Sequence, residues 1–509
     1  MKLKKIIIVA LSALTFTTAN AGGYLTNTNQ CAAFLRNPAR EGVIAIDGVY
    51  SNPAGVAFLG QGFHLGLNAQ AAWQTRTIDT TCPLFALGKE NNGMTTKRFK
   101  GEAQAPFIPS IQAAYNKNRW SFQFGFAVTG GGGKCEFSDG LGSFESAVGM
   151  IAKKLEAFGA EGYDVNSYMQ GRQFYFGFTV GAAYKVTENL SVYGGLRVIY
   201  GDASYKAKIS DIMVKTKEQY VPFSNFLDGV NDYITNNLTS IEENLPKVDA
   251  GIAQLEPVKN MPGYKEKYDE LVATKAKLEG AKAQLEGARP QVSALEIYRE
   301  GVNLKSDQNG IGFAPVIGID YKIGNFNFAA KYDFRVKMSM KNNSTVKEAM
   351  AIEAVNQFQD GTSVREDSPA LLALGAQWSI VPSVRVSAGY HHFYDKQSKK
   401  YNDKQDLLKG GTDEYLTGLE LDVTKKLTLS GGMQITRYGN TDDFMSDMSF
   451  TTDSWSYGFG AKYQVNDKVA INAAYFKTCY DKYTAEKPEI TNEFTRSNRV
   501  AALGVELTF

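Results

Sequence analysis

Charged residues recur at alternate positions within segments that are otherwise apolar or built from small residues. The set consists of Arg197, Asp320, Lys331, Asp333, Arg335, Lys337, Glu420, Asp422 and Glu506. Alternate side chains of a strand point to the same face, so these charges would line one side of a wall. A charge on an enclosed face needs a partner or water. We therefore expect either ion pairs with another segment or solvation by water inside the wall.

Partners for these charges are available in an N-terminal segment, residues 22–60, that lacks sustained alternation. Arg36 and Arg40 lie there, and they are the candidates to pair with Glu420 and Glu506 of the wall. Such pairs would fix the segment against the wall, whereas solvated charges would only keep the enclosed space wet.

One tripeptide occurs twice in the same segment, as Asn37-Pro38-Ala39 and as Asn52-Pro53-Ala54. Proline fixes φ, and the asparagine side chain can bond to the backbone two residues on. Each copy therefore predicts a tight turn.

Catalytic chemistry has few candidates in this chain. The histidines are His64, His391 and His392. His391 and His392 would point to opposite faces of a strand, so they cannot hold one metal ion together. No metalloprotease helix motif, nucleophile elbow or phosphate loop is present, and only His392 would face outward to serve a hydrolase of the outer wall. We expect no enzyme, no metal and no cofactor.

Fourteen alternating segments carry these residues, with apolar side chains on one face and small or polar ones on the other. Six tight breaks separate them in pairs: 116–118, 187–189, 323–325, 381–383, 424–426 and 466–468. Longer polar gaps lie between the pairs, near 77–101, 131–170, 207–306, 341–366, 398–412, 440–452 and 482–495. Short and long gaps alternate strictly, as periplasmic turns and extracellular loops do. The pattern predicts an all-β transmembrane barrel of fourteen antiparallel strands over residues 61–509.

Aromatic residues near the ends of these segments predict two girdles at the membrane interfaces. They are Trp73, Tyr115, Trp120, Tyr184, Tyr321, Trp378, Tyr390, Tyr438, Trp455 and Tyr463.

Both ends of the chain agree with an outer-membrane barrel. Lysines precede an apolar run, and Ala19-Asn20-Ala21 has the form of a signal-peptidase site, so residues 1–21 are predicted to be a signal peptide. The last strand ends on Phe509. No stretch approaches about 20 continuous apolar residues, which excludes helical spans. Losing the three signal-peptide lysines changes the formal charge from +2 to about −1, so no nucleic-acid partner is indicated.

The sequence resembles the FadL-type outer-membrane transport family, which includes the TodX-like aromatic-hydrocarbon channels. The resemblance rests on Arg36-Asn37-Pro38-Ala39-Arg40, on Gly48 to Gly55 leading into the first strand, on the fourteen strands and on Phe509. It implies that residues 22–60 form a hatch, or plug, with Asn52-Pro53-Ala54 as the hatch motif. It also implies that hydrophobic molecules bind among the outer loops and reach a pocket beside the hatch.

In that family the exit is lateral, through a gap made by a kinked third strand. The third strand here, Trp120 to Val128, holds no proline. A kink would therefore have to come from Gly125 or from the run Gly130 to Gly133, with Gly130 and Gly131 as the first candidates.

The loop over residues 207–306 is much longer than the others and has a helical pattern. Apolar residues keep 4-3 spacing from Ile241 to Leu255 and again from Leu271 to Leu295, with Met261-Pro262-Gly263 between them. Two helices packed as an antiparallel hairpin are predicted. The hairpin could shield the barrel mouth or bind a specific partner, and spacing does not decide between them.

Four cysteines allow two disulfides in an oxidising compartment. Cys31 lies in the N-terminal segment, and Cys82, Cys135 and Cys479 are expected on the extracellular side. A bridge between Cys82 and Cys135 is favoured, because they fall in neighbouring loops.

The leading function is passive uptake of hydrophobic small molecules, such as long-chain fatty acids or aromatic hydrocarbons. The expected location is the outer membrane, as a monomer in contact with outer-membrane lipid and lipopolysaccharide. The alternative is a surface adhesin or receptor that uses the helical loop with the barrel as an anchor, and an outer-membrane hydrolase is disfavoured by the histidines.

Overall fold

The computed structural model describes residues 26–217, 219–346 and 357–509. The predicted signal peptide and the first residues of the N-terminal segment lie outside them.

The described residues form eighteen strands in one sheet, and fourteen of these make up the wall of a barrel. The wall strands are β1 (Gly62–Thr81), β2 (Thr96–Lys117), β3 (Trp120–Phe137), β4 (Gly162–Lys185), β5 (Leu190–Lys215), β7 (Val302–Ile323), β8 (Phe326–Asp333), β11 (Leu371–Val381), β12 (Val384–Phe393), β13 (Thr412–Asp422), β14 (Leu427–Arg437), β15 (Ser454–Asn466), β16 (Val469–Tyr480) and β18 (Ile490–Thr508). The four short strands are β6 (Tyr220–Pro222), β9 (Ser339–Val346), β10 (Ser363–Arg365) and β17 (Tyr483–Lys487).

The ring closes where β1 pairs with β18, from His64 opposite Thr508 to Thr81 opposite Thr491. Every wall strand is antiparallel to both neighbours, so closure leaves the wall without an edge. The prediction of a fourteen-strand antiparallel barrel is confirmed.

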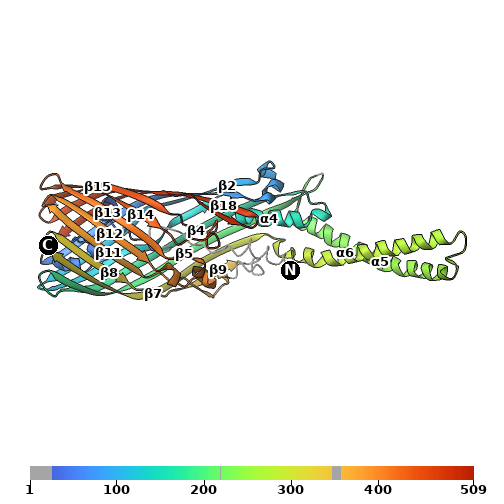
Figure 1. Ribbon diagram of the computed structural model, residues 1–509, viewed down its shortest axis with the longest axis horizontal. Coiled ribbons are helices and arrows are strands. Elements are labelled where there is room, and N and C mark those ends of the chain that lie inside the picture. Colours follow the sequence, from blue (N-terminus) through green and yellow to red (C-terminus); the bar gives the residue numbers. More distant parts are fainter. Residues whose placement is uncertain (1–25, 218, 347–356) are drawn as a thin grey trace.

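Six short turns lie together on one rim, which we call the turn rim. Backbone hydrogen bonds link each turn to the next hairpin, for example from Lys185 to Arg119 at 2.8 Å and from Lys322 to Asn189 at 2.8 Å. The C-terminus lies on the same rim, where Phe509 donates to Phe63 at 2.9 Å. The opposite end, which carries the long connections, is called the loop end (Figure 1).

Near the turn rim the wall is apolar outside and polar or small inside. Beyond this band the pattern reverses. On β5, Val198 and Tyr200 are the last apolar residues to face outward, and Lys206 and Lys208 face outward further along the strand. The inward side of that further stretch is apolar. This reversal marks where a surrounding lipid layer would end, because a wall above it behaves like that of a soluble protein.

The reversal also explains why the strands are longer than the sequence pattern indicates. β4 and β5 have 24 and 26 residues, whereas β8 and β11 to β16 have 8 to 13. The long strands form a half-wall that continues past the short ones (Figure 1). Loops pack against its apolar inner face and build a large hydrophobic core at the loop end, which includes Phe85, Phe144, Phe223 and Phe450. Tyr438 belongs to this core and not to an aromatic girdle, because β14 ends one residue before it.

The α-helices occupy the lumen and the loop end. They are α2 (Ala32–Arg36), α3 (Gly48–Ser51), α4 (Gly142–Lys154), α5 (Phe223–Leu255) and α6 (Lys265–Ser293). Short 3-10 helices are η1 (Gly55–Phe58), η2 (Pro83–Leu87), η3 (Lys89–Asn91), η4 (Glu156–Phe158), η5 (Glu256–Val258), η6 (Glu296–Tyr298), η9 (Asp395–Gln397) and η10 (Tyr401–Leu407). None of the helices in the described ranges is long and apolar enough to cross a membrane.

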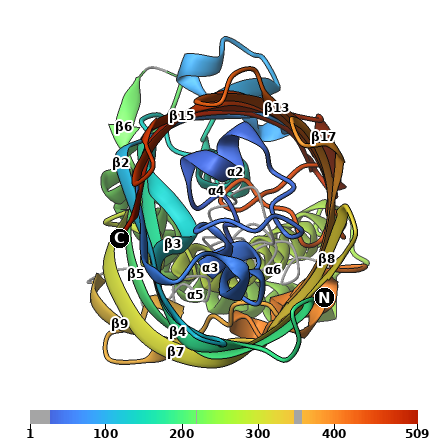
Figure 2. The ribbon, with the colours of Figure 1, turned by 90° about the vertical axis from the view of Figure 1, so that its left-hand side faces the viewer.

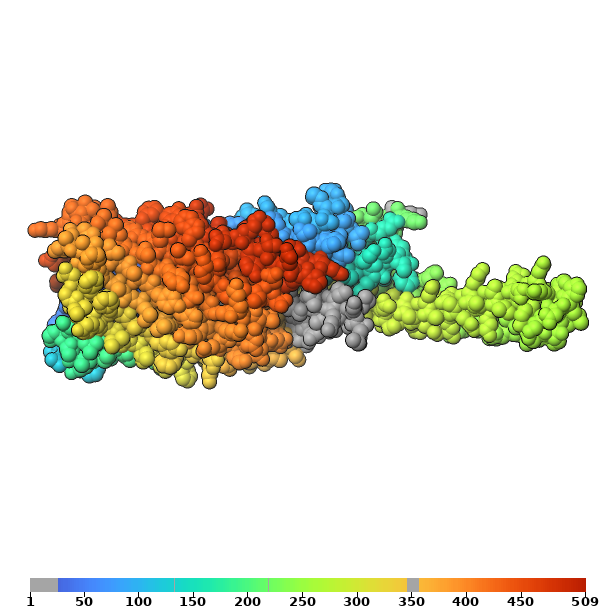
Figure 3. Space-filling model, viewed as in Figure 1, coloured from blue at the N-terminus to red at the C-terminus, as the bar shows by residue number. Residues whose placement is uncertain are grey.

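Helices α5 and α6 pack side by side and project far beyond the barrel (Figures 1 and 3). The base of this hairpin joins the loop-end core through Leu227 and Ile234. Its distal part is held by a half-buried apolar seam and by ion pairs across the two helices, such as Lys275 with Asp249 at 2.7 Å.

All four cysteines are free, so the favoured bridge between Cys82 and Cys135 is not formed. The two thiols lie at different heights on the half-wall. The amide of Cys82 bonds to Thr95 just before β2, whereas Cys135 pairs with Ala103 seven residues into that strand. Seven residues of strand span about 23 Å, far beyond the reach of a disulfide.

Candidate functional site

The inner segment, residues 26–60, lies inside the ring (Figure 2). Its helices α2 and α3 and the 3-10 helix η1 are too short to be stable alone, so the wall must hold them. Apolar contacts hold one end of the segment against the wall, because Ala32, Phe34 and Leu35 are buried against Phe476 and Val500.

A row of glycines lets the wall approach the backbone of α2. Gly418, Gly432 and Gly458 lie opposite one another on β13, β14 and β15. A Cβ atom on Gly458 would lie 1.9 Å from the carbonyl oxygen of Leu35, and one on Gly418 would lie 1.7 Å from the side chain of Asn37. Any larger residue in this row would push the inner segment away from the wall.

Glu420 of β13 is the main charged contact of the inner segment. Arg36 donates to Glu420 at 2.7 Å, and Arg40 lies 3.4 Å from the same oxygen. Arg40 also forms a two-point pair with Asp47 at 2.8 Å for each bond. All four side chains are buried. The geometry corresponds to the first of the two alternatives, ion pairs between the segment and the wall.

Glu506, the other predicted partner, contacts the wall and not the inner segment. It accepts from Lys462 at 2.5 Å and from Asn472 at 2.8 Å. Asn472 in turn accepts from Arg36 at 3.1 Å, so the link from Glu506 to the segment is indirect. Alternation places Glu506 on the inward face, but a charged neighbour on the wall lies closer than Arg36.

His391 of β12 forms a second charged contact with the inner segment. One ring nitrogen lies 2.7 Å from Glu41 and the other 2.8 Å from Glu414 of β13. Carboxylates only accept hydrogen bonds, so an imidazolium that donates from both nitrogens satisfies both contacts. His392 faces the other side and bonds to Asp413 at 2.7 Å.

The two Asn-Pro-Ala tripeptides have the same role. Asn37 ends α2 and Asn52 ends α3, and the proline that follows cannot continue a helix. The Asn37 side chain accepts from the amide of Ala39, whereas that of Asn52 accepts from Gly55, three residues on and not two. Each asparagine also reaches the wall, Asn52 by donating to Asp320 at 2.6 Å.

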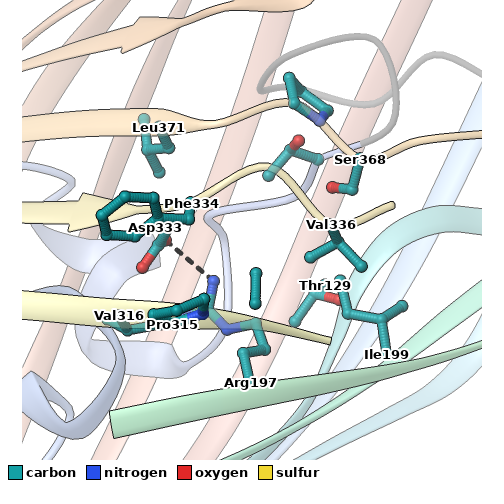
Figure 4. A pocket seen from close by; sticks show the side chains of 13 residues that line it. Thr129, Arg197, Ile199, Pro315, Val316, Asp333, Phe334, Val336, Ser368 and Leu371 are labelled. Carbon is teal, nitrogen blue, oxygen red and sulfur yellow. Dashed lines mark hydrogen bonds and ion pairs between the residues drawn. The ribbon is translucent and has the colours of Figure 1, made fainter. Parts of the chain in front are cut away.

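A third charged contact surrounds Tyr50. Lys331 donates to its backbone oxygen at 2.8 Å, and Arg197 lies over its ring. Arg197 also donates to Asp333 at 2.8 Å, as Figure 4 shows. The small cavity beside this pair, about 10 Å³, is lined by Thr26 and by strands β3, β5, β7 and β8.

The first residues of the inner segment bond to β3 through uncharged groups. The amide of Asn27 donates to Thr129 at 2.7 Å, and its side chain donates to Val128 at 3.3 Å. Gln30 also reaches Val128, at 3.4 Å. These carbonyls belong to a part of β3 that does not pair with β2.

Pairing between β2 and β3 is interrupted within the wall. It runs from Lys117 to Ile111 of β2, stops, and resumes at Gln104, which leaves 105–110 of β2 facing 127–133 of β3 without ladder pairs. We call this stretch the wall gap. Pro106 and Pro109 lie in it on β2 and have no N–H to donate.

The irregular pairing of β3 lies in its glycine run. Gly131 and Gly133 have φ of 76° and 80°, and the register with β4 shifts at Gly130 and again after Gly131. Gly125, the other kink candidate, sits in regular pairing. Its role is close approach, because a Cβ there would lie 3.1 Å from Val49 of the inner segment.

A cavity of about 50 Å³ lies behind the wall gap. It is bounded by Asn27 and Asn29 of the inner segment, by Ala105 and Ile108 of β2 and by Val128 of β3. The cavity therefore separates the wall gap from the inner segment.

Sequence reasoning placed Arg36, Arg40 and Glu420 in this site but missed two features. Metal-ligand spacing alone gives His391 no role, whereas its inward position on a strand and the carboxylate of Glu41 in the N-terminal segment are signals for this contact. Pro106 and Pro109 do not follow from the resemblance, because it implies a kink in the third strand and these prolines lie on the second.

No family model matches the chain, and no curated protein matches it. Among solved structures, a FadL homologue from Pseudomonas aeruginosa has a TM-score of 0.61 at 12% identity, covering 96% of this chain and 100% of that one. The toluene transporter TodX from P. putida has a TM-score of 0.51 at 13% identity, covering 91% and 94%. The chain therefore has the fold of these barrels.

Proposed function

We propose that this protein is an outer-membrane channel for passive uptake of hydrophobic small molecules, such as long-chain fatty acids or aromatic hydrocarbons. The wall gap between β2 and β3 carries the proposal. The inner segment fills the lumen, so a solute needs another way out, and the wall gap offers one toward lipid. The shared fold with a FadL homologue and with TodX supports the same conclusion.

The route runs from the loop end to the cavity behind the wall gap and then sideways through the wall. A cavity of about 50 Å³ is well below the roughly 300 Å³ or more of pockets that enclose a drug-sized ligand. Passage therefore requires the inner segment to withdraw near Asn27 and Asn29. The uncharged hydrogen bonds there yield more readily than the buried ion pairs at Glu420.

The orientation follows from the two rims. The turn rim faces the periplasm and the loop end faces outward, because short turns and long loops are distributed in this way in such barrels. Residues 1–21 are then a signal peptide and residues 22–60 a plug. The barrel works as a monomer without a cofactor, and the concentration gradient drives uptake without enzymatic turnover.

Filling the cavity tests the proposal. Ala105 lines it, whereas Ala113 on the same strand faces outward. We expect Ala105→Trp to reduce uptake of labelled oleate and toluene by cells to background, and Ala113→Trp to leave uptake within about two-fold of wild type. Both variants must remain heat-modifiable, which shows that the barrel has folded. Equal uptake by both variants would exclude the wall gap as the route, and wild-type uptake no higher than without the protein would reject transport.

An adhesin or receptor role remains the second candidate, because the hairpin of α5 and α6 extends far from the barrel (Figure 3). Its exposed tip carries Met261 and Tyr264, which are 55% and 46% exposed. Large side chains exposed at the end of a rigid arm are suited to contact with a partner.

A further inference from the structure

Two cations face outward on neighbouring strands without a carboxylate to neutralise them. Arg499 of β18 and Lys477 of β16 lie directly opposite each other, and both are exposed. Opposed residues of an antiparallel pair have Cβ atoms about 5 Å apart, and like charges in this position destabilise the sheet. Within the described ranges, neither side chain forms an ion pair. The two cations therefore need an anion from outside the chain.

Other outward cations at this height are neutralised by the chain itself. Lys134 of β3 pairs with Glu136 at 2.6 Å, and Arg172 of β4 pairs with Asp202 at 2.6 Å. Near Arg499 and Lys477, the outward positions two residues along each strand are Ser497, Ala501, Tyr475 and Cys479. None of these can supply a carboxylate.

Aromatic side chains border the two cations on both sides. Trp73 of β1 lies opposite Arg499, and Tyr457 of β15 lies opposite Lys477. Four neighbouring strands thus present an aromatic, a cation, a cation and an aromatic in one row. Trp and Tyr prefer the level of lipid headgroups, so the row lies where headgroup and acyl chains meet.

The height of the row on the barrel also places it at the level of the lipid headgroups. On β18 the outward residues from Phe509 to Ala501 are apolar, and Arg499 is the first polar one. Ten residues of a strand tilted by about 40° rise roughly 25 Å, which is the height of the apolar band of such barrels. The two cations therefore lie at the boundary that is distant from the turn rim.

We propose that Arg499 and Lys477 bind a phosphate group of a glycolipid of the outer leaflet, with lipid A as the chemical class. Arginine binds phosphate through two parallel hydrogen bonds, and lysine adds a point charge. The acyl chains lie below, over Ala501 and Ala71, whose small side chains leave space beside Trp73. The inference rests on the outer-membrane placement proposed above, but not on transport.

Titration of the purified barrel in detergent with diphosphoryl lipid A tests the proposal, with native mass spectrometry and the melting temperature as readouts. One variant combines Lys477→Ala with Arg499→Ala. The other is Lys477→Glu, which would pair with Arg499 on the outer face of the wall and so should fold at least as well. The matched control is Lys134→Ala with Arg172→Ala, which removes two outward cations that are already neutralised.

We expect both site variants to bind lipid A at least about ten-fold more weakly, the loss typical of one charge-assisted contact, and the control to stay within about two-fold. Lys477→Arg should retain binding. An equal loss in the control, or equal binding of lipid A without phosphates, would overturn the proposal. An equal rise in melting temperature with glucosamine 1-phosphate would also overturn the proposal, because the site would then bind a free phosphate and not a lipid. Lipid A binding without hydrocarbon uptake would reject transport and leave this site standing.

Discussion

Glu420 is the wall residue through which two arginines of the inner segment are held. It lies between Arg36 and Arg40 and also 3.4 Å from Arg385 of β12, so its carboxylate offsets three buried or partly buried cations. Removing one partner of a buried pair costs more than the pair itself contributes, because the remaining charge stays uncompensated.

We therefore predict that Glu420→Gln weakens the seating of the inner segment by about 3–5 kcal/mol. The control is Glu102→Gln, at an exposed outward pair with Lys100, where the expected effect is below about 1 kcal/mol. Urea titration followed by proteolysis of residues 26–60 measures both. Similar urea midpoints for the two variants would contradict the role of Glu420 in holding the inner segment.

The glycine row gives a second prediction at this scale. In Gly458→Ala the added methyl would overlap Leu35, so α2 must move and the barrel should leak small solutes. Gly431→Ala adds the same methyl on the outward face of β14, where the nearest atom is 3.5 Å away. Influx of a small sugar into proteoliposomes should rise for Gly458→Ala alone, with both barrels heat-modifiable. Leakage in both would point to a general defect of the wall.

At the residue scale, alternation identifies the inward charges within the regular strands but not which charges meet. It assigns Arg335 and Lys337 to the wrong face, because both lie beyond the end of β8 at Asp333, where Val336 and Met338 are the buried residues. Alternation assigns Glu420 and Glu506 to the same face. Their partners depend on the height at which each strand enters the ring, and this is set by closure between β1 and β18, far apart in the chain. Arg36 consequently meets Glu420, and Glu506 meets Lys462.

At the scale of elements, the reversal of polarity along the long strands limited what the sequence could show. The six turns and the strand count follow from alternation near the turn rim. Beyond that band the same strands become polar outside. The sequence pattern therefore predicts a loop from residue 207, although β5 continues to Lys215. A pattern that changes phase within one strand resembles a strand end followed by a loop.

Helix α4 is held at the loop end by a carboxyl group from another loop. Asp447, between β14 and β15, is buried and accepts from the amide of Ser143 in the first turn of α4 at 2.7 Å. Burial raises the pKa of Asp447, and the hydrogen bond from Ser143 offsets only part of this rise. A carboxyl whose pKa is raised in the folded state stabilises that state at low pH, and the contribution is lost as pH rises through the raised value.

We predict that α4 docks most firmly at acidic pH and loosens as pH rises through the raised pKa of Asp447. Asp447→Asn keeps an acceptor without the charge, so it should remove this dependence. Hydrogen exchange of residues 142–154, corrected for intrinsic rates, measures it. The control is Asp139→Asn, at an exposed position just before α4, and this variant should behave as wild type. A slope that persists in Asp447→Asn would contradict the role of this carboxyl.

At the scale of the whole molecule, the hairpin and the barrel are separable. The hairpin base belongs to the loop-end core up to Ile234 and Leu238 on α5 and from Val292 on α6. The distal part adds only its own half-buried seam. Removing residues 243–288 and joining the ends with a short glycine-serine turn therefore keeps the core.

We predict that this shortened protein folds and takes up hydrophobic solutes within about two-fold of wild type, since the removed part contributes only the partly buried Leu285 to the loop-end core. Loss of cell-surface binding with unchanged uptake would establish the hairpin as a binding arm. Loss of uptake with a heat-modifiable barrel would instead show that the distal hairpin takes part in capture.

The height of the wall gap has a consequence for the two leaflets. Residues 105–110 of β2 lie across from Asn68 to Ala72 of β1, which places the opening about 15–25 Å from the turn rim, in the distant half of the apolar band. A solute that leaves there enters a single leaflet. Neutral aromatics then cross to the other leaflet rapidly, but a fatty acid must first lose its charge, so flipping limits the rate. Delivered fatty acid should accumulate within reach of an external quencher before it reaches the periplasmic side, and toluene should show no such delay.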